Sequence, residues 1–253
     1  MARVVALANQ KGGVGKSTTA INLSSYLAKK GKSVLVCDVD PQGNATSTLG
    51  IDKKSLDFCM YDLILGNASL EDVVMRSVRE NMSLVPATIN LAGAEIELVS
   101  TMSRETRMKK VIDSVRADYD YILMDCPPSL GLLTINALTA ADSVIIPLQC
   151  EYFALEGLSQ LMDTIDLVRD NLNTTLEIEG IVLTMYDPRT RISKQIEDEV
   201  RGFFKEKVYK TIIPRNVRLS EAPSFGLTID AYDGTCAGAR AYEKLAKEVM
   251  LCG

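Results

Sequence analysis

Short apolar runs alternate with longer segments of helical periodicity along most of the chain. The runs lack polar residues at alternate positions, which is typical of strands that are buried on both faces. Strands are therefore predicted at 4–7, 34–37, 121–124, 143–147 and 181–183. The segments between them carry apolar residues at helical spacing. Helices are predicted at about 16–30, 103–118, 158–172, 192–203 and 236–250.

This alternation predicts the fold class. Strands that alternate with helices pair in parallel through right-handed crossovers. We expect one doubly wound α/β domain over residues 1–253, with a mostly parallel sheet and helices on both faces. Residues 51–100 are less regular, with short helices expected near 69–72 and 92–99 around a weak strand at 83–85. Ligands of such sheets bind beyond the carboxyl ends of the strands, so the residues after each strand matter most.

The composition narrows the possible chemistry. The chain has 28 Lys and Arg, 33 Asp and Glu and no histidine, which gives a net charge of −5. Without an imidazole, Ser-His-Asp catalysis, Cys-His catalysis and histidine-ligated metal sites are excluded. Proton transfer therefore falls to Asp, Glu, Lys, Tyr or Cys, and a hard metal must be held by oxygen atoms.

Hydropathy and cysteine spacing predict a cytoplasmic protein without a membrane anchor. No apolar run approaches the roughly 20 residues that span a bilayer, and the apolar run at 4–8 is too short for a signal peptide. The six cysteines form no Cys-x-x-Cys pair, so a zinc ribbon or a thioredoxin-type site has no support. Cys37 and Cys126 lie in or beside predicted strands, and we interpret them as reduced thiols of the core.

A phosphate-binding loop follows the first predicted strand. Its sequence, KGGVGKST over 11–18, combines a glycine-rich turn, a lysine, a hydroxyl residue and a following helix. The glycines let backbone N–H groups converge on phosphate oxygens, and the helix N-terminus adds partial positive charge. Lys16 can reach the β- and γ-phosphates of ATP, and the Ser17 hydroxyl can ligate Mg²⁺. The predicted nucleotide-binding residues of the loop are Lys11, Gly12, Gly13, Val14, Gly15, Lys16, Ser17 and Thr18.

Lys11 is the unusual residue of this loop, because an ordinary P-loop needs no lysine directly before its glycine pair. At the mouth of the loop, Lys11 can reach a nucleotide held by a second subunit and act there as arginine fingers do. It can equally be a solvated surface lysine. The residues alone leave these two interpretations open.

Carboxylates follow two of the predicted strands. The strand 121–124 leads into Asp125, a Walker B arrangement that would hold Mg²⁺ beside Ser17, directly or through water. Asp38 and Asp40 follow another strand and share one face. We assign Asp40 to the attacking water, because it lies further beyond the strand end. Asp38 would support the Mg²⁺ shell or the loop, and a purely structural loop cap is an open alternative.

Several long motifs together resemble the ParA/MinD group of deviant Walker ATPases. The resemblance rests on KGGVGKST, DVDPQGNATSTLG and YILMDCPPSLGLLTINAL, and the ParA/Soj branch is indicated by IVLTMYDPRTRIS, IPRNVRLSEAPSFGLTIDAYD and ARAYEKLAKEV. It covers nearly the whole chain. The resemblance implies slow Mg²⁺-dependent hydrolysis of ATP to ADP and phosphate, with Asp40 as the hydrolytic carboxylate. It also implies an ATP-sandwich homodimer in which Lys11 contacts the partner's nucleotide, and it places Pro214 and Asn216 beside the adenine.

The resemblance further implies what the ATP-bound dimer does. Such a dimer binds double-stranded DNA without sequence preference, and it segregates or positions chromosomal DNA together with a ParB-type centromere-binding protein. We therefore expect the protein in the cytoplasm, associated with the nucleoid. Plasmid members often carry an N-terminal helix-turn-helix extension. Here the first predicted strand begins near Arg3, so we expect that extension to be absent.

Charge is distributed unevenly along the chain. Residues 185–219 hold nine basic and five acidic residues, a net charge of +4, which leaves −9 on the remaining residues. Because the residues outside 185–219 are acidic overall, the protein can bind DNA phosphates only where basic residues converge on one face. Arg189 and Arg218 are the preferred DNA contacts, because we expect them on loops after strand-like runs, with Arg215 beside them. An ordinary solvated face better explains Lys205, Lys207 and Lys210.

Three other functions fit parts of the sequence. A MinD-like membrane-associated positioning ATPase needs a C-terminal amphipathic helix. The last predicted helix has a modest apolar stripe that we expect to pack on the domain, namely Tyr242, Leu245, Ala246, Val249 and Met250. An electron carrier that resembles nitrogenase reductase needs two cysteines that ligate an iron–sulfur cluster, for which Cys126 and Cys150 are conceivable. A metabolic P-loop enzyme of the dethiobiotin-synthetase kind lacks an evident substrate site here.

Overall fold

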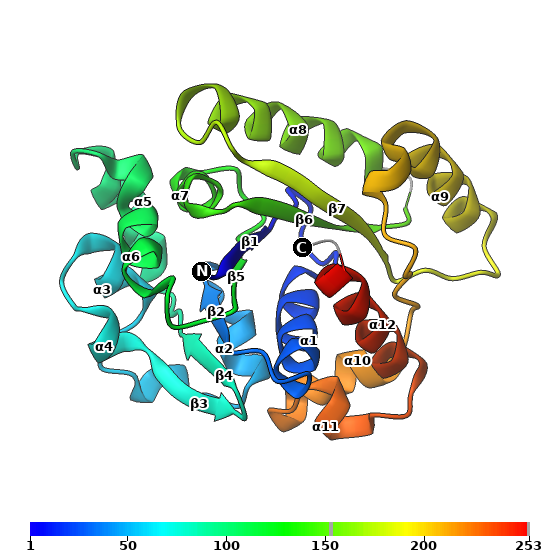
Figure 1. Ribbon diagram of the computed structural model, residues 1–253, viewed down its shortest axis with the longest axis horizontal. Helices are drawn as coiled ribbons and strands as arrows, with labels where there is room; N and C mark the ends of the chain where they lie inside the picture. Colours follow the sequence, from blue (N-terminus) through cyan, green and yellow to red (C-terminus); the bar gives the residue numbers. More distant parts are fainter. Residues whose placement is uncertain (152–153, 252–253) are drawn as a thin grey trace.

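The strands form one twisted sheet between two layers of helices (Figure 1). The computed structural model describes residues 1–151 and 154–251. The strands within these ranges are β1 (Arg3–Leu7), β2 (Val34–Asp38), β3 (Met75–Arg79), β4 (Met82–Val85), β5 (Tyr121–Asp125), β6 (Ser143–Gln149) and β7 (Glu177–Thr184). Their order is β3-β4-β2-β5-β1-β6-β7. All neighbouring pairs are parallel except β3 and β4, which are antiparallel.

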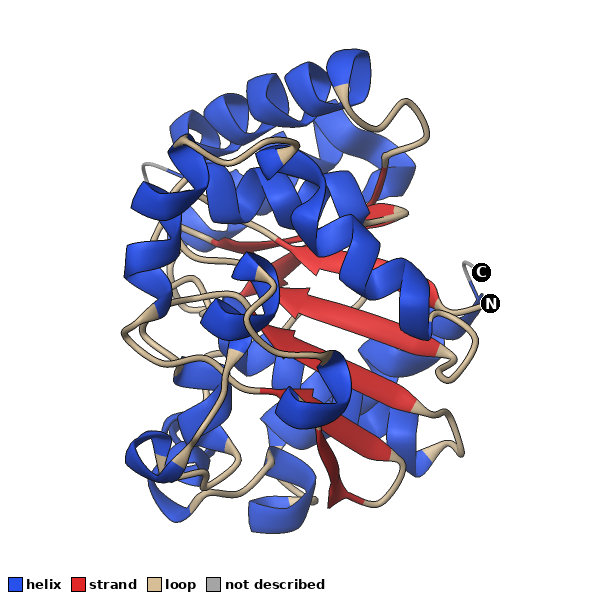
Figure 2. Ribbon diagram, turned by 90° about the vertical axis from the view of Figure 1, so that its left-hand side faces the viewer, coloured by secondary structure: helices blue, strands red, loops and turns tan. Residues whose placement is uncertain are grey.

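Helices cover both faces of the sheet (Figure 2). The α-helices of the described ranges are α1 (Lys16–Lys29), α2 (Asn44–Thr48), α3 (Met60–Leu65), α4 (Leu70–Val73), α5 (Leu91–Val99), α6 (Arg107–Val115), α7 (Leu132–Ala140), α8 (Ala154–Asn171), α9 (Arg191–Phe204), α10 (Val217–Glu221), α11 (Ile229–Asp233) and α12 (Ala237–Leu251). Short 3₁₀ helices are η1 (Lys53–Ser55), η2 (Arg104–Thr106), η3 (Lys205–Lys207) and η4 (Ala222–Phe225).

Each face of the sheet has its own apolar core. Alternate residues of a strand point to opposite faces. Val4 and Ala6 of β1 accordingly pack in a core with α3 and with the helices from α5 to α9. Val5 and Leu7 of the same strand pack in a second core with α1, α11 and α12. The sheet is therefore buried on both sides, which explains why its central strands read as unbroken apolar runs.

The fold class predicted from the sequence is confirmed: the sheet is doubly wound and mostly parallel. The hydrophobic pattern does not predict β3, because its sequence MRSVR contains only two apolar residues, Met75 and Val78. This edge strand forms by pairing with β4 across a tight turn in which Asn81 takes a left-handed conformation, with φ 57°. The helix predicted at 103–118 is shorter, because a 3₁₀ turn, η2, precedes α6.

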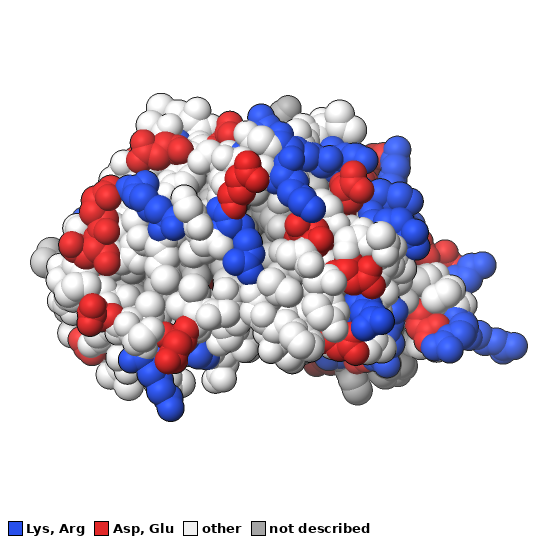
Figure 3. Space-filling model, turned by 90° about the horizontal axis from the view of Figure 1, so that it is seen from below, with Lys and Arg blue, Asp and Glu red and all other residues white. Residues whose placement is uncertain are grey.

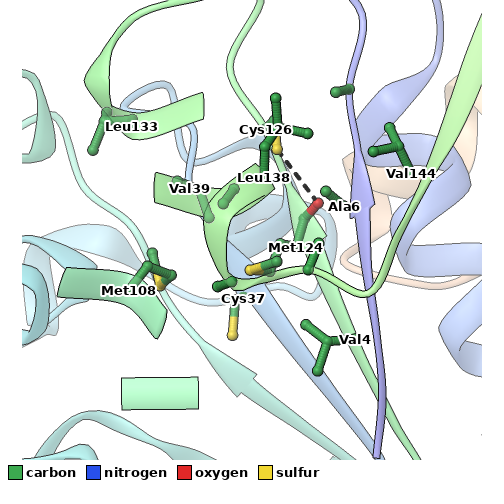
Figure 4. Close-up of a cluster of buried hydrophobic side chains, with 14 of the residues drawn as sticks. Val4, Ala6, Cys37, Val39, Met108, Met124, Cys126, Leu133, Leu138 and Val144 are labelled. Atoms are coloured by element: carbon green, nitrogen blue, oxygen red, sulfur yellow. Dashed lines mark hydrogen bonds between the residues drawn. The ribbon is translucent and has the colours of Figure 1, made fainter. Parts of the chain in front are cut away.

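The core thiols are buried as predicted (Figure 4). Cys37 and Cys126 are at most 1% exposed, and neither forms a disulfide. Burial raises the pKa of Cys37 to about 12 and that of Cys126 still further above its usual value. The Cys126 thiol donates a weak hydrogen bond to the Met124 carbonyl oxygen over 3.8 Å. Thiols in such surroundings stay protonated and unreactive, so the interpretation as reduced core residues is confirmed.

The register of the central strands sets up the functional site. Leu7 at the end of β1 and Asp38 at the end of β2 both pair with Asp125 at the end of β5. Three strands therefore finish side by side at the carboxyl edge of the sheet. The loops that leave these three strands are brought together although 118 residues separate the first strand end from the last.

Candidate nucleotide-binding site

The P-loop between β1 and α1 is shaped by glycines in left-handed conformations. Gly13 has φ 75° and Gly15 has φ 86°, a region that residues with a side chain avoid. Gly15 is also the N-cap of α1. The Thr184 hydroxyl at the end of β7 donates to the Val14 carbonyl oxygen over 2.8 Å. This contact from β7, which β6 separates from β1 in the sheet, thus holds the loop that leads into the helix N-terminus, where anions bind.

Lys16 lies across the P-loop and is shielded from water. Its ammonium group donates to the Lys11 carbonyl oxygen over 3.2 Å, and the residue is 6% exposed. Burial lowers the pKa of Lys16, and the charge of Asp125 opposes this shift. A positive charge that is partly desolvated and held against the loop is suited to contact phosphate oxygens.

Asp125 is a fully buried carboxylate without a hydrogen bond of good geometry to any described residue. Burial and the nearby Asp38 carboxylate raise the pKa of Asp125 well above its usual range, while a weaker contact with the Ser17 hydroxyl and the Lys16 charge act against this shift. A buried carboxylate without a partner costs free energy. A hard divalent cation with oxygen ligands would satisfy it. Asp125 and Ser17 therefore fit the Mg²⁺ site that the sequence predicts.

Asp38 is equally buried but its oxygens already have partners. Its Oδ2 accepts hydrogen bonds from the N–H and the hydroxyl of Thr46, over 2.8 and 2.7 Å. Its Oδ1 accepts the N–H of Asp40 over 3.3 Å. Burial raises the pKa of Asp38 to about 6, against the effect of these hydrogen bonds. Of the roles open to Asp38, this geometry favours support of the loop over a place in the Mg²⁺ shell.

Asp40 faces the P-loop across a cavity of about 450 Å³. Its Oδ1 accepts the N–H of Gln42 over 2.9 Å, and the residue is 6% exposed. The second oxygen is thus available to face the cavity. The structure brings Asp40 together with the predicted P-loop residues that line the same cavity, namely Gly12, Gly13, Gly15, Lys16, Ser17 and Thr18.

A second cavity, of about 400 Å³, adjoins the P-loop on the side of β7. Gly15 and Thr18 line one side, and Pro214 and Asn216 line another. The Asn216 side-chain oxygen accepts the N–H of Arg218 over 2.9 Å and caps α10. Pro214 and Asn216 therefore lie where a base attached to a P-loop-bound polyphosphate would be placed.

Of the residues of this second cavity that the sequence-based prediction lacks, two come from the end of β7. Thr184 and Met185 lie at the end of β7 and line the cavity beside Pro214. Met185 has φ 50°, a conformation that is uncommon for residues other than glycine and that often marks ligand sites. The available signal was their place directly after a buried strand, where ligands of parallel sheets bind.

Lys11 points away from the P-loop toward the segment after β6. Its Nζ pairs with Glu151 Oε2 over 2.9 Å, and the two side chains are 34% and 48% exposed. An ion pair as exposed as this one contributes little to stability. Lys11 can therefore exchange Glu151 for another anion at small cost, as a role on a second subunit's nucleotide would require.

The predicted DNA-binding arginines lie on neighbouring segments. Tyr186 and Pro214 form a parallel bridge, and the Arg215 N–H donates to the Tyr186 carbonyl oxygen over 3.0 Å. This places the loop that carries Arg189 beside Arg215, with α10 following directly. Figure 3 shows basic side chains gathered toward the right-hand side of the molecule, where Figure 1 places α9, α10 and α12, with acidic ones among them. We call Arg189, Arg215 and Arg218 the arginine edge.

All three arginines of this edge are exposed, and two of them pair with nearby carboxylates. Arg189 is 85% exposed and pairs with Asp187 over 2.7 Å. Arg218 is 53% exposed and pairs with Glu221 over 2.9 Å and with Asp233 over 3.6 Å. Arg218 lies within α10 and not on a loop, so that part of the prediction is wrong. Both guanidinium groups keep an exposed side that a DNA phosphate can approach.

The side chains that a MinD-like membrane protein or an iron–sulfur electron carrier would need at its surface are buried here. Tyr242 and Leu245 of α12 are at most 1% exposed and pack in the core beside α1, which confirms that the stripe faces the domain. Cys126 and Cys150 are at most 4% exposed within the other core, whereas a cluster shared by two subunits needs cysteines at a surface. Within the described ranges, no helix has both the length and the apolar composition needed to cross a membrane.

The fold and the site together define a P-loop nucleotide-binding protein: a buried strand, a glycine-rich loop and a helix stand beside a strand-end carboxylate. Residues 2–178 match the family described as "AAA domain". The chain is 58% identical over 253 residues to the sporulation initiation inhibitor protein Soj of Bacillus subtilis, with all of both chains covered. It is 53% identical over 250 residues to the chromosome partitioning protein ParA of Caulobacter vibrioides, covering 98% of this chain and 94% of that one. The chain belongs to the Soj/ParA family of chromosome-partitioning ATPases.

A solved structure supports the same fold. The cobyrinic acid a,c-diamide synthase of Mycobacterium smegmatis, with bound ADP and magnesium, matches with a TM-score of 0.87 and 38% identity. The match covers 99% of this chain and 94% of that chain. The arrangement of strands and helices is therefore shared along nearly the whole length of both proteins.

Proposed function

We propose that this chain is an ATP-dependent switch that acts on chromosomal DNA. ATP would bind with its phosphates in the P-loop cavity and its adenine in the cavity lined by Pro214 and Asn216. Ser17 and Asp125 would hold Mg²⁺, directly or through water, because Asp125 is a buried carboxylate that lacks a partner. The ADP and magnesium bound to the structural neighbour support this assignment.

Hydrolysis in this proposal depends on lysines and carboxylates, since the chain has no histidine. Lys16 binds the β- and γ-phosphates and neutralises charge that develops during transfer. Asp40 accepts a hydrogen bond from the attacking water and orients it toward the γ-phosphate. Lys11 leaves Glu151 and contacts the nucleotide of a second subunit, where it stabilises the same charge. Bound Mg²⁺ supplies further charge neutralisation at the phosphates.

Dimerisation links the nucleotide to DNA. A sandwich of two subunits carries two copies of the arginine edge, so the dimer makes about twice as many phosphate contacts as one chain. Because the binding constant depends steeply on that number, the ATP-bound dimer binds double-stranded DNA without sequence preference and the monomer binds it weakly. Slow hydrolysis resets the switch. A ParB-type centromere-binding protein is the partner, and the protein works in the cytoplasm on the nucleoid.

One observation supports this function above all others: in a chain of the partitioning family, Lys16 and Asp40 line one P-loop cavity, and the unpartnered Asp125 lies buried near enough to act on the charge of Lys16. A switch needs a site that distinguishes ATP from ADP. Asp40 lines the cavity beside the P-loop, where the γ-phosphate would lie, so the site contains a group that responds to that phosphate.

The test is a salt-titrated measurement of DNA binding with ATP, with ADP and without nucleotide. We expect tight, salt-sensitive binding only with ATP. Asp40→Ala should stop hydrolysis while ATP-dependent DNA binding persists, and Lys11→Ala should retain ATP binding but lose the dimer. Equal DNA binding in all three nucleotide states would contradict the proposal. ATP-dependent binding to anionic lipid vesicles in place of DNA would favour the membrane-associated alternative.

A further inference from the structure

Thr46, in α2, lies at the centre of a buried chain of hydrogen bonds beside the Asp40 loop. Its hydroxyl accepts the N–H of Ala87, just after β4, over 3.0 Å and donates to Asp38 Oδ2 over 2.7 Å. Its own N–H donates to the same Asp38 oxygen over 2.8 Å. Asp38 Oδ1 in turn accepts the N–H of Asp40 over 3.3 Å. These hydrogen bonds therefore connect Ala87 to Asp40 through Thr46 and Asp38.

The direction of these hydrogen bonds is set by proton count. A hydroxyl has one proton, and because Thr46 accepts from Ala87, that proton is directed to Asp38. Thr46 and Asp38 are both 0% exposed, so water cannot replace a lost donor. Valine has nearly the shape of threonine but can neither accept from Ala87 nor donate to Asp38. The hydroxyl, and not only the volume, is therefore required at this position.

A separate observation also connects the Asp40 loop to Ala87, because the loop packs on the end of β4. Gly43 has φ 60°, and a Cβ on it would come within 2.7 Å of the Ala87 carbonyl oxygen. The Gly43 N–H donates to the Asp40 carbonyl oxygen over 2.8 Å. The same Cβ would come within 2.7 Å of Lys53 Cδ, and the Lys53 ammonium donates to the Gln42 carbonyl oxygen over 2.7 Å. The loop is thus packed closely against Ala87 and Lys53.

We propose that Thr46 is a positioning residue for ATP hydrolysis. Through Asp38 it holds the backbone of Asp40, and through Ala87 it ties this loop to the end of β4. Thr46 is fully buried, so it acts through Asp38 and not by contact with the nucleotide. The inference rests on the proposed role of Asp40. It also gives a function to residues 51–100, whose Lys53 and Ala87 hold the loop.

The experiment compares Thr46→Val, Thr46→Ser and a matched control, Thr139→Val. Thr139 is also 0% exposed, but its hydroxyl bonds only within α7, to the Ile135 carbonyl oxygen over 2.7 Å. Single-turnover ATP hydrolysis and the dissociation constant of a fluorescent ATP analogue are measured for each variant. We expect Thr46→Val to slow hydrolysis about 10- to 100-fold, the factor associated with one lost hydrogen bond to a charged group. ATP affinity should change less than about 3-fold, because Thr46 does not touch the nucleotide.

Thr46→Ser should restore hydrolysis to within about 3-fold of wild type, because it retains the hydroxyl. Thr139→Val should hydrolyse ATP normally. Wild-type hydrolysis by Thr46→Val, or a loss of ATP affinity as large as the loss of rate, would overturn the inference. If Thr46→Val does not fold, hydrogen exchange in the nucleotide-free wild type decides the question. Slow exchange at the Asp40 N–H supports the inference, and exchange as fast as in an unprotected amide overturns it.

Asp40→Ala is measured beside these variants so that two failures can be separated. Normal hydrolysis by Asp40→Ala shows that the proposed role of Asp40 is wrong, whatever Thr46→Val does. An inactive Asp40→Ala together with a fully active Thr46→Val shows that only the inference about Thr46 is wrong.

Discussion

The nucleotide cavity and the arginine edge present charged groups in opposite ways. Lys16, which lines the cavity, is 6% exposed, and Asp38 and Asp125, buried at the strand ends beside it, are 0% exposed. At the edge, the Arg189 side chain is 85% exposed and that of Arg218 is 53% exposed. Charges at the cavity interact in a medium of low dielectric constant, whereas charges at the edge are screened by water and salt.

This difference matches what each region has to do. Transfer of a phosphoryl group depends on the position of a few atoms, and small displacements change its rate greatly. DNA phosphates recur along the duplex, so non-specific binding needs a number of positive charges more than an exact geometry. We therefore expect abrupt effects from substitutions at the cavity and graded, salt-dependent effects from substitutions at the edge.

Substitution of Lys16 should have the largest effect. Lys16→Ala removes the charge that lies across the P-loop, and ATP affinity should fall at least about 100-fold, because a charge-assisted contact in a shielded site is lost. Calorimetric titration with Mg²⁺ and ATP measures the change. Lys11→Ala is the control and should bind ATP as a monomer with nearly normal affinity. If Lys16→Ala still binds ATP with a micromolar dissociation constant, the expectation that substitutions at the cavity have abrupt effects is wrong.

Substitution of Asp125 should change stability in a pH-dependent way. Burial holds the pKa of Asp125 above its unfolded value, so its ionised form destabilises the fold without Mg²⁺. This penalty is absent near the usual Asp pKa of about 4 and grows as pH rises through the raised folded value. Without Mg²⁺ or nucleotide, Asp125→Asn should therefore gain about 1–3 kcal/mol at pH 8 and little at pH 4.

Thermal denaturation of Asp125→Asn at the two pH values measures this effect, with a shift of about 2–4 °C for each kcal/mol. Asp163→Asn, an exposed carboxylate on α8, is the control and should show no such pH dependence. An equal shift at both pH values would mean that the Asp125 carboxylate is not held charged and unpartnered in the fold.

Reversal of one arginine should have the smallest and most salt-dependent effect. Arg218→Glu should weaken ATP-dependent DNA binding about 10-fold and make the slope of log affinity against log salt shallower by about 1 for each lost phosphate contact. Folding and ATP affinity should not change. Arg76→Glu on β3 is a matched control, since Arg76 is also exposed and paired with a neighbouring carboxylate. Unchanged DNA binding by Arg218→Glu would place the DNA elsewhere.

The two regions also differ in how well the sequence predicts them. The P-loop is contiguous, and its requirement for left-handed glycines at 13 and 15 is visible in the residue types. The contacts that hold it are not local: Thr184 donates to Val14 across 170 residues. β3 is likewise missed, because it exists only through its pairing with β4. The arginine edge matches no sequence motif, so the sequence indicates only its positive charge. The sequence predicts Arg218 on a loop, whereas the structure has it in α10.

By itself, the sequence determined the fold class, the P-loop and the carboxylates that follow the strands. Hydrophobic periodicity and the conformational demands of glycine act over a few residues, so they can be read along the chain. Only the tertiary structure decided that Asp38 has its oxygens occupied while Asp125 lacks a partner. Both are strand-end carboxylates in apolar surroundings, and what separates them is which distant groups packing brings within hydrogen-bond distance. Burial and hydrogen-bond partners are set by the packing of the whole molecule, and they give similar residues different chemical roles.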